Sequence, residues 1–544
     1  MHPRRIKRST SITILVLLCA AASFASAQKP PEVRPIQIEN GKLLGVLTAD
    51  QKVIAYKGIP YALPPVDELR WVAPQPVGRW KNVLYARDFG PHCPQSGGYP
   101  DMVFHDPGAG EDCLTLNVWA PADAKPLRKT GGGLPVMVWI YGGGFQTGGT
   151  SENRQDGEFL AHRGVIVVSM NYRLGIFGFF ALPELTAESS KHTSGNYGLM
   201  DQAAAIAWVR SNIAAFGGDA ANITIFGESA GSISVSALMA SPIANGLFTK
   251  AIGESGSAFD SPNLVFPPLK QAEQVNAAWA DRVFGSSKLF FLRQLPAAEI
   301  LKAAMGRTRV PGPGFGPDID GYFLPDTMAH IYSDGKQAHI PLLAGWNADE
   351  NRPNTPPTAD SFTVQTHIDF GPDALKFLAV YPASNDAEAV RSANDFAGDR
   401  FIAFGTWKWL EAQTQTGHAP VYRYFFTLGS PGDRNHPAAW ALSTPTTSSM
   451  SSARSTRGRA SRFAPKTAPS PTRCSSTGPT SPNRRPETRT ALTCPNGPSI
   501  TPQATIRSCT STRPPPPNPT RSAPATSSST ASGAAPPRQS EPSD

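Results

Sequence analysis

The strongest chemical signal in the sequence is a serine set between small residues at positions 227–231, which read Gly-Glu-Ser-Ala-Gly. An apolar run precedes it at 222–226, and residues 232–239 after it can form a helix. Glycines on both sides relieve the crowding of a tight strand-to-helix turn, which pushes the serine Oγ out at the helix N-terminus. This context predicts a nucleophile at Ser229, the alternative being an ordinary turn. Residues 253–256 read Gly-Glu-Ser-Gly without the final glycine of the first motif, and we interpret Ser255 as structural.

Acyl transfer by a serine also needs hydrogen-bond donors where the oxyanion develops. The glycines at 142–144 follow an apolar run at 136–140 and offer backbone N–H groups that no side chain shields. The N–H of Ala230 would be the remaining donor. These glycines predict an oxyanion hole, whereas a tri-glycine by itself is equally compatible with a flexible turn.

The elements that must position these residues alternate along the chain from Val46 to Thr427. Strand-like apolar runs lie at 134–141, 165–171, 223–226, 251–254, 340–345 and 421–427. Helix-like pieces lie between them, such as the alanine-rich stretch 200–216, which stops at two glycines. The alternation predicts an α/β fold with a largely parallel, twisted sheet flanked by helices.

The formal net charge of +8 suggests an anionic partner until the charges are located. Residues 1–27 contribute +4 and residues 441–544 contribute +10, which leaves the body, 28–440, at −6. A folded region of that sign has no electrostatic reason to bind the phosphates of nucleic acid, so we expect no nucleic-acid partner.

The first 27 residues have the build of a secretory signal peptide. Basic residues at 4–8 precede an apolar run at 12–22 and the small residues Ala-Ser-Ala at 25–27, with cleavage expected after Ala27. The apolar run is too short to span a bilayer stably. A buried N-terminal helix and a lipid anchor at Cys19 are the alternatives. We expect a secreted or periplasmic protein without a stable membrane anchor.

The last 104 residues, 441–544, differ sharply from the body in composition. Of these, 82 are Ala, Ser, Thr, Pro or Arg, and only six are large apolar residues, too few to offset the entropy of ordering the segment. We expect a disordered tail. It could be a stalk or linker, a basic tether, or the product of a shifted reading frame. The last is preferred, because a frame shifted at Trp440 permits a catalytic histidine segment that the body lacks.

Several long motifs together resemble the type-B carboxylesterase family, which includes the cholinesterases. They lie at 57–62, 111–119, 141–145, 171–179, 195–202, 216–231 and 320–325. The resemblance runs from about Val46 to about Thr427 and implies an α/β-hydrolase fold. It also implies that Ser229 is the nucleophile of a serine esterase, and that Gly143, Gly144 and Ala230 supply the oxyanion hole.

The acid of the family is usually a glutamate in a Gly-x-Asn-x-Asp-Glu-Gly segment. Residues 343–351 match this segment and point to Glu350, although Asn351 stands where the family usually has glycine. Asp349 is the adjacent alternative, and Glu350 as one more solvated loop charge is the other.

Outside the signal segment and the tail, the chain has two cysteines, Cys93 and Cys113. The family joins the corresponding pair in an early disulfide, which the resemblance carries over to this chain. In an oxidising compartment such a bridge adds roughly 3 kcal/mol of stability. Two unpaired thiols are the alternative.

The base of the expected triad is missing. The family places its histidine after the acid, and beyond Glu350 the chain offers only His367, His418 and His436. His436 lies a few residues short of the expected place and is interpreted as a solvated loop residue. The shifted frame from Trp440 permits the family's histidine segment position by position.

The sequence therefore predicts an exported carboxylic ester hydrolase that acts on small-molecule esters and uses no metal and no organic cofactor. The chain as written could be inactive because it lacks the histidine. The alternative is a catalytically silent, cholinesterase-like binding or adhesion protein.

Overall fold

The computed structural model describes residues 33–95, 97–99, 101–127, 131–262, 264–306 and 312–427. The predictions for the signal segment 1–27, for His436 and for the tail 441–544 lie outside these residues, as do the proposed domain limits at 28 and 440.

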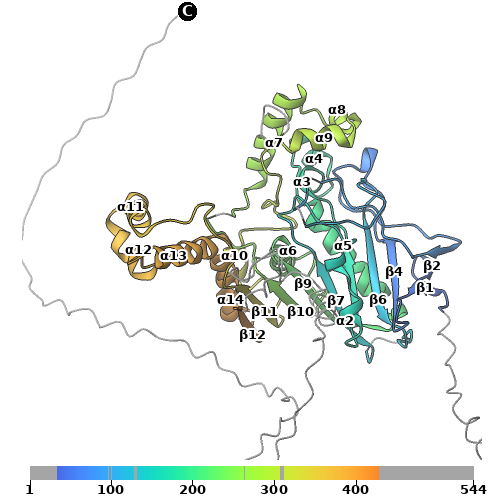
Figure 1. Cartoon of the computed structure of the whole chain (residues 1–544). Coiled ribbons are helices and arrows are strands. Elements are labelled where there is room, and N and C mark those ends of the chain that lie inside the picture. The colour runs from blue at the N-terminus through green and yellow to red at the C-terminus, as the bar shows by residue number, and fades with distance from the viewer. Residues whose placement is uncertain are drawn as a thin grey trace, which may run out of the picture. The chain divides into compact units, whose positions relative to one another are not determined.

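One large sheet forms the centre of the described residues. Its strands are β3 (Val46–Leu47), β4 (Val53–Pro60), β6 (Thr115–Pro121), β7 (Leu134–Ile140), β8 (Ile166–Met170), β9 (Gly218–Glu228), β10 (Lys250–Glu254), β11 (Leu342–Asn347) and β12 (Val421–Phe426). They are ordered β12-β11-β10-β9-β7-β8-β6-β4-β3 (Figure 1). The strands from β12 to β8 pair in parallel, and β6, β4 and β3 pair antiparallel. The predicted α/β fold with a largely parallel sheet is confirmed.

A small second sheet combines β1 (Ile36–Ile38), β2 (Gly41–Leu44) and β5 (Val83–Tyr85). The α-helices are α2 (Glu158–Ala161), α3 (Gly175–Phe179), α4 (Pro183–Glu188), α5 (Tyr197–Asn212), α6 (Ala230–Ala240), α7 (Leu269–Phe284), α8 (Leu289–Gln294), α9 (Ala297–Ala304), α10 (Met328–Ser333), α11 (Ala359–Phe370), α12 (Ala374–Val380), α13 (Asp386–Gly398) and α14 (Phe404–Thr416). Short 3-10 turns are η2 (Asp67–Leu69), η3 (Asn153–Gln155), η4 (Ile213–Phe216) and η5 (Gly371–Asp373), and η6 (Asp399–Ala403) is a π-helical turn.

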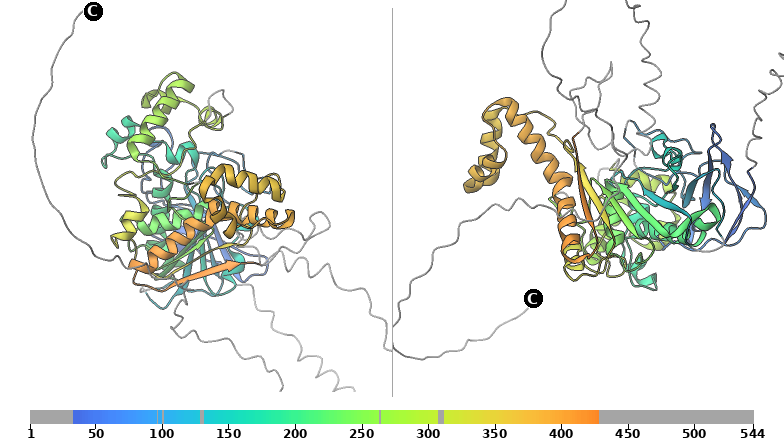
Figure 2. Two further views of the ribbon diagram at one scale, coloured as in Figure 1. Left: turned by 90° about the vertical axis from the view of Figure 1, so that its left-hand side faces the viewer. Right: turned by 90° about the horizontal axis from the view of Figure 1, so that it is seen from below.

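The helices cover the sheet because their apolar residues are buried against it. Helix α5 packs on β8 and β9, α6 packs on β7, β9 and β10, and α14 packs on β11 and β12. Beyond the β12 end of the sheet, α11, α12 and α13 pack on one another (Figure 2). Among the described residues, none of the helices has the length and apolar character needed to cross a membrane.

The predicted elements lie close to the observed ones. The apolar run 223–226 is the buried end of β9, whose first residue Gly218 pairs with Leu134 of β7. The helix expected at 200–216 begins at Tyr197, and its last four residues form η4. It ends where Gly217 adopts a left-handed conformation with φ of 89°, which glycine takes without steric cost.

Helix α6 is rich in serine and yet completely buried. Its serines satisfy their hydroxyl groups locally, which removes the cost of burying them. Ser234 donates to the carbonyl of Ala230 at 2.8 Å, and Ser236 donates to that of Ile233 at 2.8 Å. A helix without exposed residues can therefore start at the serine turn and run through the core.

Candidate active site

Ser229 lies in the turn between β9 and α6, with φ of 54° and ψ of −122°. A positive φ is uncommon for a residue with a side chain and costs of order 1–3 kcal/mol. The turn is held on both sides, because the Ser229 N–H donates to the carbonyl of Glu254 at 2.9 Å and its carbonyl accepts from Ile233 at 2.9 Å. Between residues 225 and 241, Ser229 is the single residue that is not fully buried.

The glycines beside this serine are required by close backbone contacts. A Cβ at Gly231 would lie 2.0 Å from the carbonyl oxygen of Ile140, and one at Gly227 would lie 2.6 Å from the carbonyl oxygen of Gly231. Both contacts are far shorter than van der Waals distance. The turn can therefore form against β7 only with glycine at these two positions.

The tri-glycine segment lies directly against the serine turn. A Cβ at Gly142 would lie 3.0 Å from the Ser229 Cβ, and one at Gly143 would lie 2.0 Å from the carbonyl oxygen of Thr147. Gly143 and Gly144 have φ of 106° and 64°. These values favour glycine, so the segment is a shaped loop.

Ser229 opens onto a cavity of about 250 Å³. Gly143 and Glu350 line it together with Ser229, whereas Gly144 and Ala230 are the next residues along the chain from lining residues. Aromatic and apolar side chains form much of the remaining wall, and the full lining is Tyr99, Met102, Trp139, Tyr141, Gly142, Gly143, Gly148, Glu152, Arg154, Gln155, Glu228, Ser229, Glu350 and Phe401. The structure thus brings the predicted nucleophile, acid and glycine loop to one cavity.

Glu350 follows β11 and is 5% exposed. Its Oε1 accepts hydrogen bonds from the Ser255 hydroxyl at 2.5 Å and from the Asn347 N–H at 2.7 Å. Asp349, the adjacent alternative, faces away toward Asp395 and raises the pKa of that group. Of the two acids, Glu350 is the one placed in the cavity wall, and it is held there by hydrogen bonds.

Two further carboxyl groups lie near Glu350. Burial, followed by the charges of Glu254 and Glu350, raises the pKa of Glu228 well above its usual range. Burial also raises the pKa of Glu254 to about 7. Both effects favour the neutral acids, so Glu228 carries a proton at neutral pH and Glu254 is close to half-ionised.

The cavity wall also carries a guanidinium group. Arg154 Nε lies 2.6 Å from Glu152 Oε2, and its Nη1 lies 2.9 Å from Asp101 Oδ2. Burial raises the pKa of Glu152, and the charge of Arg154 opposes that rise. The positive charge is thus held at the wall by two carboxylates.

Histidine is absent from the lining among the residues that the structure describes. His367 lies within α11, and His418 follows α14, where its ring packs on that of His339 with centroids 5.5 Å apart. Of the three histidines after Glu350, His436 is outside the described part of the chain. Within the described residues, the cavity holds a serine and an acid without the base that would link them.

Cys93 and Cys113 are both fully buried, and the structure joins their Sγ atoms, with Cα atoms 5.1 Å apart. The bridge closes a loop with a sequence separation of 20 residues. This geometry is compatible with the disulfide that the resemblance implies.

The sequence pattern did not reveal the contact between Ser255 and Glu350, nor the grouping of Glu228 with Glu254. The one available signal is the repeated Gly-Glu-Ser at 227–229 and 253–255. These residues lie on adjacent strands, with Gly227 opposite Gly253 and Glu228 opposite Glu254. Ser255, like Ser229, has a positive φ, of 55°.

Comparisons with known proteins agree with this site. A sequence profile described as "Carboxylesterase family" matches residues 32–454. The fumonisin B1 esterase of Sphingopyxis macrogoltabida is 36% identical, over 79% of this chain and 77% of that protein. The para-nitrobenzyl esterase of Bacillus subtilis (strain 168) is 37% identical, over 72% of this chain and 78% of that protein. A solved PNB esterase superposes with a TM-score of 0.62 and 36% identity, covering 76% of this chain and 83% of that one.

Proposed function

The chain belongs to the carboxylesterase family and has the α/β-hydrolase fold, and from this premise we propose that it hydrolyses carboxylic esters with Ser229 as the nucleophile. One observation carries the assignment. Ser229 alone breaks the burial of residues 225–241, in a turn of positive φ that opens onto the cavity. A buried core turn has no need of a strained, partly exposed serine, whereas a nucleophile needs both properties.

In the proposed reaction, the Ser229 hydroxyl attacks the ester carbonyl, loses its proton to a histidine base and forms an acyl-enzyme as the alcohol leaves. Water then releases the acid and regenerates the hydroxyl. Gly143, Gly144 and Ala230 donate their N–H groups to the oxyanion, each donor lowering the barrier by about 3 kcal/mol. Glu350 orients the histidine. Side chains and backbone supply every step, so the proposal assigns no role to a metal or an organic cofactor.

The base is the weak point of the written chain. We propose that a change of reading frame near residue 439 has replaced the family's histidine segment by the tail 441–544. The carboxylesterase profile ends its match at residue 454 of 544, and no described histidine lines the cavity. Both observations are compatible with this proposal. The written chain would then have little or no turnover, and His436 would not replace the lost base.

We further propose that residues 1–27 are an export signal and that the domain spans 28–440. The mature protein would act outside the cytoplasm on small-molecule esters, where the Cys93–Cys113 bridge is stable. The aromatic walls of the cavity suit uncharged aryl or benzyl esters, and one relative is named for para-nitrobenzyl esters.

Nucleotide sequencing across codon 439 tests the frame change directly. An inserted or deleted base that restores an open frame encoding the histidine segment supports it, and an unbroken gene without that segment refutes it.

An ester assay then separates the hydrolase from a silent binding protein. The written chain, the frame-restored chain and Ser229→Ala in each background are compared on short-chain para-nitrophenyl esters. We expect turnover in the restored chain that Ser229→Ala abolishes, and far less turnover in the written chain. A folded, restored chain without turnover would favour the binding protein. Turnover that survives Ser229→Ala would refute the assigned nucleophile.

A further inference from the structure

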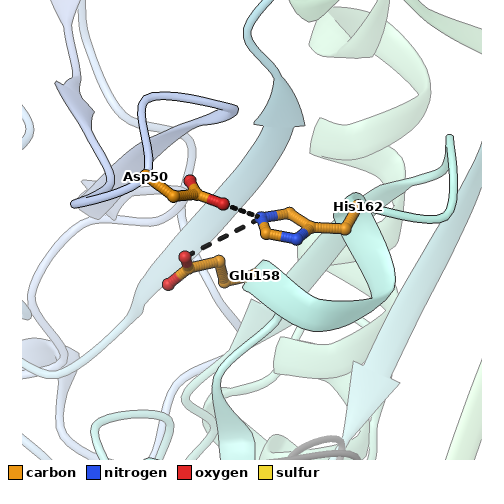
Figure 3. Close-up of side chains that lie close together, drawn as sticks. All are labelled: Asp50, Glu158 and His162. Atoms are coloured by element: carbon orange, nitrogen blue, oxygen red, sulfur yellow. Dashed lines mark ion pairs between the residues drawn. The ribbon is translucent and has the colours of Figure 1, made fainter.

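Three side chains that commonly bind metal ions meet on the far side of the segment that forms the cavity wall. Asp50 comes from the turn between β3 and β4, and Glu158 and His162 come from α2 and its C-terminal end (Figure 3). His162 Nε2 lies 3.2 Å from Asp50 Oδ2 and 3.8 Å from Glu158 Oε1. One ligand atom of each residue lies within 4.8 Å of the other two.

We propose that Asp50, Glu158 and His162 form a binding site for a divalent transition-metal ion, with Zn²⁺ as the best fit. Zinc binds histidine nitrogen and carboxylate oxygen at about 2.0–2.2 Å, so two ligands of a tetrahedral ion lie roughly 3.4 Å apart. The distances of 3.2 and 3.8 Å bracket that value. Small side-chain rotations would complete the coordination, without movement of the backbone.

Neighbouring groups hold Asp50 in the required orientation. Its Oδ1 accepts hydrogen bonds from the Thr48 hydroxyl at 2.9 Å and from the Lys52 N–H at 3.0 Å, which leaves Oδ2 directed at His162. Support of this kind from outside the coordination shell orients ligands and raises metal affinity. Glu158 and His162 lie four residues apart, so the helical turn places them on one face.

The chemistry of the three ligands selects the kind of ion. Two carboxylates and one neutral imidazole match the charge of a divalent cation, and the imidazole favours Zn²⁺ over Ca²⁺ or Mg²⁺, which prefer oxygen. The side chains of Asp50, Glu158 and His162 are 39%, 19% and 25% exposed. Solvent therefore reaches the site, and water can fill the fourth position.

The site would act on structure and not on ester chemistry, since none of its three residues lines the Ser229 cavity. However, α2 directly follows the segment of Arg154 and Gln155, which do line it. A bound ion would tie that segment to the β3–β4 turn. This departs from the sequence-based expectation of no metal, because Asp50 and Glu158 are 108 positions apart and form no recognisable motif.

Isothermal titration of the untagged full-length chain with ZnCl₂ tests the proposal. The protein is first freed of metal with EDTA, and its free thiols are blocked with iodoacetamide. We expect one Zn²⁺ per chain, and we expect His162→Ala and Asp50→Asn each to weaken binding by about tenfold or more. Binding should also raise the melting temperature of the wild type, because the ion binds the folded state.

His330→Ala is the matched control. His330 is a more exposed histidine that also has a carboxylate four residues away, with Nδ1 3.1 Å from Asp326 Oδ1, but it has no second carboxylate ligand. Its replacement should leave Zn²⁺ affinity unchanged. The proposal is overturned if the wild type does not bind Zn²⁺, or if His162→Ala binds as tightly as His330→Ala. Asp50→Asn changes an exposed turn and decides the matter if His162→Ala does not fold.

Discussion

The hydroxyl of Ser255 donates a 2.5 Å hydrogen bond to Oε1 of Glu350, which lies 95 positions further along the chain. Both residues are almost completely buried, and the Asn347 N–H reaches the same oxygen at 2.7 Å. Two donors thus set the orientation of the carboxylate in the cavity wall. In the proposed reaction this carboxylate orients the base, so Ser255 would act as a positioning residue.

Ser255→Ala should lower kcat of the frame-restored enzyme about tenfold or more and change KM little. A hydrogen bond to a charged group contributes about 1.5–3 kcal/mol, and each 1.4 kcal/mol is a factor of ten in rate. Steady-state kinetics on a short-chain ester measure both constants. Ser232→Ala is the control, because Ser232 is equally buried and donates instead to the carbonyl of Gly256 at 2.6 Å. Equal losses in the two variants would assign the effect to packing.

Gly231→Ala should abolish activity and destabilise the fold, because its Cβ would lie 2.0 Å from the Ile140 carbonyl oxygen. The loss of stability should exceed 2 kcal/mol, the range of backbone clashes in a packed core. Chemical denaturation and the ester assay measure the two effects. Gly246→Ala meets no atom within 4 Å and bears only its positive φ of 76°, a cost of roughly 1–2 kcal/mol. A fully active Gly231→Ala would contradict the tight turn.

Glu254→Gln should change how stability depends on pH. Burial raises the pKa of Glu254 to about 7 from 4.5, so the folded state binds the proton more tightly than the unfolded state does. Stability therefore falls as pH rises from about 4.5 to 7, by up to about 3 kcal/mol. Glutamine cannot ionise, so the variant should gain stability over the wild type across this window and keep the gain above pH 7.

Melting temperatures of the wild type and Glu254→Gln between pH 4 and pH 8 check this. Glu411→Gln, on the exposed face of α14, controls for the loss of one negative charge. A stability difference that stays constant over the whole range would show that burial does not perturb Glu254.

Asp201→Asn should cost about 3–5 kcal/mol, because it leaves the buried Arg173 guanidinium without its counter-charge. Arg173 Nε and Nη2 bind the two oxygens of Asp201 at 2.8 and 2.7 Å, and both residues are at most 2% exposed. The urea midpoint reports the loss. Asp373→Asn breaks the exposed pair with Lys376 and should leave the midpoint nearly unchanged. Similar midpoints for the two variants would refute a structural role for the buried pair.

Replacing both Cys93 and Cys113 by alanine should lower stability by about 3 kcal/mol, the chain-entropy effect of opening a loop of this length. Dithiothreitol should lower the melting temperature of the wild type and leave that of the double variant unchanged. A wild type that does not respond to the reductant would mean that the two thiols are unpaired.

The sequence alone was sufficient for the α/β class, for most strand positions and for the end of α5 at Gly217. These features depend on local periodicity and on residues whose conformational preferences act at their own position. The serine turn is of this kind, because Gly227 and Gly231 flank Ser229 within five residues and steric crowding requires them there. The resemblance of motifs extended this local information to Glu350.

The tertiary structure decided which distant residues meet. The order of strands places β10 between β9 and β11, which sets Glu254 beside Glu228 and Ser255 beside Glu350. It also brings Asp50 to His162 across 112 positions of sequence. Contacts of this kind depend on the order and register of strands, and burial then sets the charge of each carboxyl. Neither property is encoded in the neighbourhood of any single residue.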